Sequence, residues 1–216
     1  MRILRVTFLS IWGVPDCTWD LTGPGGRARE LAVVTGPAAS GKTRVLEALV
    51  AAKEVLGAYG PPPDPERWIR PGDRTAKIEL VLELDEDEQR RAGVASATVG
   101  AEALFGSQGV RAEIDDGVID VLEHYEHDPR FGKWDYLPEG RAIPALGVVG
   151  TSAMEQRILR LTAEPRKYGF VSRLLVEIDH DAAARARFEA ALAALCPSVR
   201  YLGVTAAHPA GALSSR

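Results

Sequence analysis

The order of apolar and polar residues predicts a sheet in the first half of the chain. The two kinds of residue alternate over 2–9, 17–21 and 76–84, with the period of a half-buried strand. Residues 31–34, Leu-Ala-Val-Val, are apolar at every position, which predicts a strand buried on both faces. A weaker pattern over 94–114 predicts further short strands. We therefore expect a sheet whose best-buried strand is 31–34.

Helical spacing replaces this alternation in other segments. Apolar residues recur at intervals of three and four over 43–57 and again over 116–125. Most of 152–196 has the same spacing, and a charged helical turn is expected over 85–91. Residues 133–137 alternate and predict one more strand. The chain therefore mixes helices and strands, and we expect an α/β fold.

Residues 36–43 carry the strongest chemical signal in the sequence. They fit the pattern G-x-x-x-x-G-K-[ST], in which glycines let the backbone wrap a phosphate chain with its N–H groups pointing inward. Lys42 is expected to reach the β- and γ-phosphates, and the Thr43 hydroxyl is expected to bind Mg²⁺. The helix that follows adds the positive end of its dipole. The candidate nucleotide-binding residues are Gly36, Pro37, Ala38, Ala39, Ser40, Gly41, Lys42 and Thr43.

Composition narrows the class of protein. The chain has 216 residues, 46% hydrophobic and 26% charged, which is ordinary for a globular protein, and its formal net charge is −4. No apolar run is long enough to span a membrane, and the N-terminal stretch predicts neither a signal peptide nor an anchor. Two cysteines far apart in sequence favour a reduced, cytoplasmic protein. The slightly acidic total charge gives no electrostatic footprint for nucleic acid.

The position of the phosphate-binding loop resembles that in one group of ATPases. Two alternating strands and a glycine-rich turn precede it, as in the first lobe of AAA-family, ABC-type ATPase heads of the SMC and RecF kind. Ser10-Ile11-Trp12-Gly13 looks like the aromatic-glycine turn that lies near the adenine in those proteins. The resemblance therefore adds Trp12 to the candidate nucleotide-binding residues. Residues 133–141 are similar to a strand end found in RecF-like ATPases.

This resemblance implies a P-loop NTPase fold in which antiparallel strands flank a Walker A strand, loop and helix. It divides the chain into a nucleotide-binding lobe over 1–150 and a helical segment of the same head over 151–216. ATP and Mg²⁺ are the implied cofactors. Such heads dimerise around nucleotide, so a homo-oligomer or a partner chain that supplies the second half of the head is expected. A nucleic-acid partner is implied by resemblance only.

The carboxylates that an ATPase needs for magnesium and for water are not evident in the sequence. Residues 80–86 contain an Asp-Glu pair, but Glu79 and Glu83 predict a half-exposed, edge-like strand instead of a buried Walker B strand. Residues 174–179 keep helical spacing and predict a packed helix. The signature motif is also absent. We therefore assign no catalytic residue and expect ATP hydrolysis only when Walker B and signature motifs come from another segment or subunit.

Two other functions remain open on the sequence alone. The missing Walker B motif suits a protein that binds nucleotide as an interaction module and does not hydrolyse it. A stand-alone P-loop kinase also fits the chain length. A kinase would need an arginine-rich lid, and the candidates do not have the spacing of a recognised lid. Those candidates are Arg70, Arg74, Arg90 and Arg91.

Overall fold

The chain, described by a computed structural model, forms two compact units, Met1–Asp135 and Tyr136–Arg216. Both units mix helices with strands, so the expected α/β class is confirmed at that level. Each unit is described by itself. The residues that the structure describes are 1–124, 134–138, 157–168, 170–205 and 208–215.

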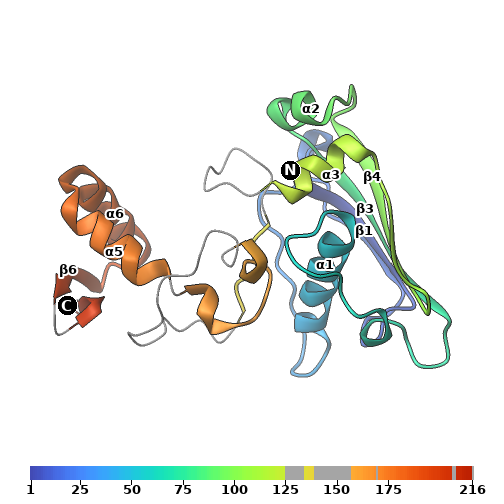
Figure 1. The fold of residues 1–216 in the computed structure, drawn as a ribbon, viewed down its shortest axis with the longest axis horizontal. Coiled ribbons are helices and arrows are strands. Elements are labelled where there is room, and N and C mark those ends of the chain that lie inside the picture. The colour runs from blue at the N-terminus through green and yellow to red at the C-terminus, as the bar shows by residue number, and fades with distance from the viewer. Residues whose placement is uncertain (125–133, 139–156, 169, 206–207, 216) are drawn as a thin grey trace. The chain divides into compact units, whose positions relative to one another are not determined.

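The first unit is built on a sheet of five strands in the order β2-β1-β3-β4-β5. Figure 1 labels its strands β1, β3 and β4. All four neighbouring pairs are antiparallel. The strands predicted from alternation over 2–9, 17–21 and 76–84 are confirmed, and the weak pattern over 94–114 is a hairpin. The strands are β1 (Arg2–Leu9), β2 (Cys17–Asp20), β3 (Thr75–Glu83), β4 (Thr98–Gly106) and β5 (Gly109–Glu113).

The two faces of this sheet differ in polarity, as alternation requires. On the inner face, Phe8 of β1, Leu80 of β3 and Phe105 of β4 are at most 1% exposed. On the outer face, Lys77 of β3 pairs with Glu102 of β4 at 3.0 Å. The hydrophobic core therefore lies on one side of the sheet, where the first helix packs (Figure 1).

Helix α1 (Lys42–Leu56) lies against β3, β4 and β5, and confirms the helix predicted from Thr43. It buries Val45, Ala48 and Leu56 on the face toward the sheet. The helix stops at Gly57, where an added Cβ would lie 2.5 Å from the Leu122 Cβ, so glycine lets α3 (Asp116–Glu123) approach. The remaining helices of this unit are α2 (Glu86–Ala92) and α3 (Asp116–Glu123), with single turns η1 (Pro24–Gly26) and η2 (Pro65–Arg67).

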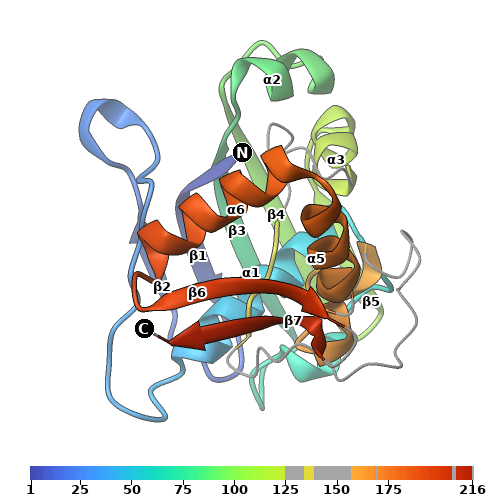
Figure 2. The same ribbon diagram turned by 90° about the vertical axis from the view of Figure 1, so that its left-hand side faces the viewer.

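The second unit packs two helices on a two-stranded antiparallel sheet (Figure 2). Near the end of the first helix, the Asp179 carboxylate accepts a hydrogen bond from the Val204 N–H at 2.5 Å and lies 3.3 Å from the Arg185 guanidinium. These contacts join both helices to the sheet. Helices predicted within 152–196 are confirmed, whereas the hairpin was not predicted. The elements are η3 (Pro165–Tyr168), α5 (Phe170–His180), α6 (Ala182–Leu195), β6 (Val199–Thr205) and β7 (His208–Ser215).

The strand predicted over 133–137 is wrong for the part that the structure describes. Residues 134–138 have no regular secondary structure. The Tyr136 N–H donates to the Arg160 carbonyl at 3.3 Å, and the buried Lys167 ammonium binds the carbonyls of both residues. The Lys167 side chain therefore satisfies carbonyls that backbone N–H groups of a neighbouring strand would satisfy in a sheet. Residues 139–141, which belong to the same resemblance, lie outside the described residues.

Candidate nucleotide-binding site

The glycine-rich loop predicted from the sequence is a tight turn that leads into α1. Gly41 has a φ of +87°, and a Cβ at this position would lie 2.7 Å from the Gly13 carbonyl oxygen. A Cβ on Gly36 would lie 2.8 Å from the Ser40 hydroxyl. Ala39 also adopts the left-handed region, with a φ of 60°. The backbone here is held in an unusual conformation, and glycine is required at Gly41, where φ is positive and the near atom is a backbone carbonyl.

Lys42 turns back over this loop. Its ammonium donates hydrogen bonds to the carbonyl oxygens of Gly36 at 3.0 Å and Pro37 at 2.5 Å, and lies 3.5 Å from the Ser40 hydroxyl. A cation is thus held at the centre of a loop that is otherwise exposed, since Pro37, Ala38, Ala39 and Ser40 all face solvent. Phosphate oxygens are the kind of acceptor that would compete for this ammonium.

The N-terminus of α1 is open to a ligand. Its N-cap residue is Gly41, which has no side chain, and no side-chain acceptor caps the first turn. The first N–H groups of a helix lack partners within the helix and carry the positive end of the dipole. Thr43 lies in this first turn and is exposed. The loop, Lys42 and the helix start therefore bring together the kinds of group that can bind a phosphate chain.

The strand predicted over 31–34 is not formed. These residues have no regular secondary structure, and Leu31 and Val33 are 76% and 73% exposed. A strand buried on both faces needs a neighbour along each edge, and no strand in the described part of the chain pairs with 31–34. Residues 31–34 are apolar, as the prediction requires. Within the described residues, however, no neighbouring strand forms hydrogen bonds with their backbone.

The Trp12 turn borders the phosphate-binding loop, because the Gly13 carbonyl faces Gly41. The Trp12 side chain is 52% exposed. It stands beside an open depression of about 650 Å³, lined by residues 12–16, Arg70 and Pro71. The resemblance placed Trp12 near a base, and the depression next to it provides room for one.

Asp16 and Arg70 face each other in this depression. Asp16 was not predicted as a site residue, and Arg70 was considered only as a lid arginine of a kinase. The Arg70 guanidinium donates to Asp16 Oδ1 at 2.6 Å and to the Val14 carbonyl at 3.1 Å. The Ser10 N–H and then the Arg70 guanidinium lower the pKa of the Asp16 carboxyl below its ordinary value. The depression therefore holds an ionised pair, whose members come from segments 54 residues apart.

Arg44 is the second group that sequence reasoning missed. It follows Thr43 in the first turn of α1 and reaches the Trp12 carbonyl. Cations are disfavoured at a helix N-terminus because they meet the positive end of the dipole. That unfavourable placement is the one signal in the sequence that could have singled out Arg44.

Asp85, the first residue of the Asp-Glu pair after β3, has a structural role together with Glu88. The Asp85 carboxylate accepts a hydrogen bond from the Glu88 N–H at 2.8 Å, and the Glu88 carboxylate accepts one from the Asp85 N–H at 3.0 Å, so the two form a capping box for α2. Glu83 is buried and accepts a hydrogen bond from the Ala28 N–H, which lowers the pKa of its carboxyl. The expectation of an edge-like strand is wrong, because β3 lies in the middle of the sheet. The expectation that 174–179 is helical is confirmed by α5.

Within the described ranges, no three His, Cys, Asp or Glu side chains gather as they would around a metal ion. Thr43, which the sequence analysis names as the magnesium ligand, lies at the loop, but no such group of side chains accompanies it within the described residues. No helix in these ranges is both long and apolar enough to cross a membrane. Comparison of the chain with protein-family models and with curated proteins finds no match.

Proposed function

We propose that this chain is the ATP-binding lobe of an SMC/RecF-like, P-loop ATPase. The observation that carries the proposal is the joined geometry of loop and helix: a glycine turn closed on Gly13, the Lys42 ammonium inside it, and an uncapped helix start behind it. In this proposal the phosphates of ATP replace the loop carbonyls around Lys42, and the base lies in the depression beside Trp12. Thr43 supplies its hydroxyl to Mg²⁺.

The proposal assigns hydrolysis to groups outside the described residues. Holding ground state and transition state equally well does not accelerate a reaction, which needs a group that positions water. Asp85 caps α2, which argues against a role in magnesium binding. The exposed apolar segment 31–34, directly before the loop, supports the idea that a strand from another segment or subunit completes the sheet there. A dimer or partner chain, and any nucleic-acid partner, follow from the resemblance alone.

Titration calorimetry with Mg-ATP tests the proposal. Wild type should bind, and saturation at about 100 times the Kd should raise the free energy of unfolding by about 2.7 kcal/mol. Lys42→Ala should abolish both effects. Thr43→Ala should weaken binding chiefly when magnesium is present, because only the hydroxyl is lost. Lys77→Ala, which removes a positive charge on the outer face of β3, is the matched control and should bind normally. Equal binding by Lys42→Ala and wild type would remove the phosphate-loop assignment.

A non-hydrolysing nucleotide-binding protein is the second candidate, favoured by the capping role of Asp85. ATP turnover separates the two. In both cases turnover by the chain alone should equal that of Lys42→Ala. Only the split-head proposal expects that adding a polypeptide with Walker B and signature motifs creates turnover that depends on both concentrations. Robust turnover by the chain alone, lost in Lys42→Ala, would favour the self-sufficient NTPase or kinase instead.

A further inference from the structure

Arg44 is a partly buried cation in the first turn of α1, where the helix dipole opposes a positive charge. Its side chain is 22% exposed. Charged groups leave water at a cost unless other contacts replace their hydration. The contacts that Arg44 makes should therefore explain why it stands next to the phosphate-binding loop.

Apart from an ion pair within α1, those contacts lead to the segments around the Trp12 turn. Arg44 Nε donates to the Trp12 carbonyl at 2.9 Å, and Nη2 donates to the Arg67 carbonyl. The guanidinium carbon lies 3.9 Å from the centre of the Trp68 ring, a cation–π contact. Glu47 of the same helix pairs with Arg44 at 3.5 Å. One planar group thus binds two backbone carbonyls and covers an aromatic face.

The two carbonyls belong to segments that are bonded to each other. The Trp12 N–H donates to the Trp68 carbonyl at 2.8 Å, and the Arg70 N–H donates to the Ser10 carbonyl at 2.9 Å. On its other side, the turn meets the phosphate-binding loop, where the Gly13 carbonyl leaves no room for a side chain at Gly41. The turn is therefore held between Gly41 and Arg44, which lie at the start of one helix.

We infer that Arg44 is a positioning residue that fixes the Trp12 turn and its depression relative to the phosphate-binding loop. The inference rests on the proposed function of that loop. A nucleoside triphosphate must engage loop and depression at once, whereas a bare polyphosphate needs the loop alone. Arg44 therefore determines selectivity for nucleoside triphosphates over inorganic polyphosphate, because it holds the Trp12 turn and the depression in place before the ligand binds.

The test compares Mg-ATP with Mg-tripolyphosphate by titration calorimetry on the full chain. Arg44→Ala should weaken ATP binding about tenfold or more, the loss expected when preorganisation is removed, and leave tripolyphosphate binding within about twofold of wild type. Arg44→Lys keeps the charge but lacks the planar fork, so it should resemble Arg44→Ala. Arg111→Ala removes a surface arginine, 74% exposed on β5, and should change neither affinity.

Each other outcome is informative. Equal loss of ATP and tripolyphosphate binding in folded Arg44→Ala would indicate a general electrostatic role and overturn the inference. Normal ATP selectivity in Arg44→Lys would show that charge alone suffices and would also overturn it. Circular dichroism checks folding, and if Arg44→Ala does not fold, Arg44→Lys carries the test. A wild type that binds tripolyphosphate as tightly as ATP overturns the positioning role while leaving the phosphate loop in place. If wild type binds neither ligand, the proposed function itself fails.

Discussion

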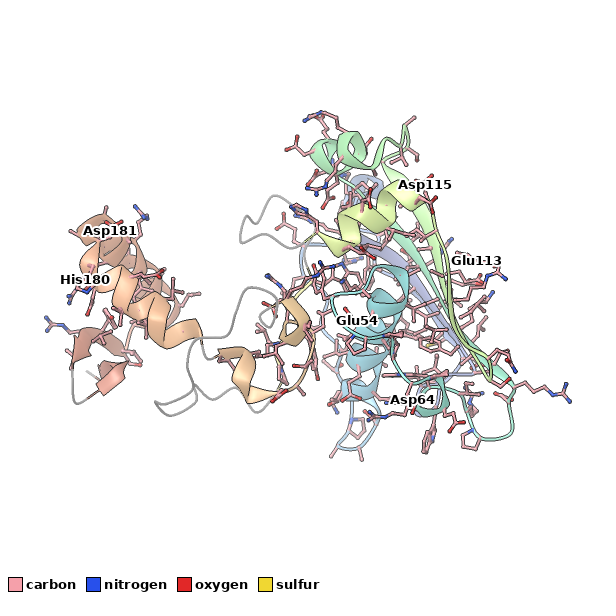
Figure 3. The ribbon with its side chains drawn as sticks, in the orientation of Figure 1. Glu54, Asp64, Glu113, Asp115, His180 and Asp181 are labelled. Atoms are coloured by element: carbon pink, nitrogen blue, oxygen red, sulfur yellow. The ribbon has the colours of Figure 1, made fainter. Side chains whose placement is uncertain are left out.

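Helices α1 and α6 have nearly the same length, 15 and 14 residues, but they begin in opposite ways. Helix α6 begins at Asp181, whose carboxylate accepts hydrogen bonds from the N–H groups of Ala183 at 2.9 Å and Ala184 at 3.1 Å (Figure 3). Helix α1 begins at Gly41 and has no side-chain cap. The first turn of α6 is thus satisfied by a side chain of its own sequence, whereas the first turn of α1 has no side-chain acceptor.

The two helices also differ in what stabilises them. Helix α1 buries six of its residues within the first unit, and α6 buries none of its residues. Most helical stability in proteins comes from packing of an apolar face, and a cap adds a smaller share. Helix α1 can leave its N-terminus uncapped because its packing compensates. A cap matters more for α6, which has little packing to depend on.

Core truncation should give the largest contrast between the two regions. Leu80→Ala removes a side chain that is 1% exposed on the inner face of β3, and should cost about 2–5 kcal/mol of unfolding free energy. Leu195→Ala removes one that is 82% exposed at the end of α6, and should change stability by about 0.5 kcal/mol or less. Urea denaturation followed by circular dichroism measures both. Similar costs for the two variants would contradict the contrast in packing.

Two glycines sharpen the comparison at the start of α1. Gly41 and Gly25 both have positive φ, +87° and +74°, but a Cβ on Gly25 meets nothing within 4 Å. Gly25→Ala should therefore cost only the left-handed penalty of about 1–2 kcal/mol. Gly41→Ala adds the clash with the Gly13 carbonyl, so it should cost more and abolish stabilisation by Mg-ATP. Thermal unfolding with and without Mg-ATP measures both. Equal behaviour would show that the close approach is not a constraint.

The smallest effect should be that of acid on the N-terminal cap of α6. The N–H groups of Ala184 and Ala183 lower the pKa of the Asp181 carboxyl below its ordinary value. The ionised cap therefore stabilises α6 above the unfolded pKa of about 4, and this contribution is lost as pH falls through the lower folded pKa. Protection of the Ala183 amide from hydrogen exchange should decrease in that window. Asp181→Asn keeps a capping oxygen without a charge, so it should remove the pH dependence. A dependence that survives in Asp181→Asn would assign it to another group.

The sequence predicted the parts of the fold that depend on local pattern. Strand β3 follows from alternation because one apolar face is enough to define a half-buried strand. Its place in the middle of the sheet was not predicted, since strand order depends on distant partners. The strand prediction for residues 31–34 was wrong for the same reason. Apolar composition indicates that a segment favours burial, but it does not show which other segment would pair with it. The hairpin β6–β7 has weak periodicity, so alternation could not reveal it.

At the candidate site, spacing identified the loop, Lys42 and Thr43, because these residues are adjacent in sequence. The contacts of Arg44 could not be predicted in the same way. One of them joins Arg44 to the Arg67 carbonyl, 23 residues away in sequence. Because every residue has a backbone carbonyl, the sequence does not show which one accepts the hydrogen bond. The Asp16–Arg70 pair likewise depends on how the chain returns between the two segments.

The exposure of the Trp12 ring gives the candidate site a property that can be followed optically. Trp12 is 52% exposed, whereas Trp68, on the other side of the same junction, is 9% exposed. An indole in water emits at longer wavelength than one in an apolar core, and a collisional quencher such as acrylamide reaches the former far more readily. A base stacked on the Trp12 ring would shield it from the quencher. The protein therefore carries its own fluorescent reporter at the candidate site.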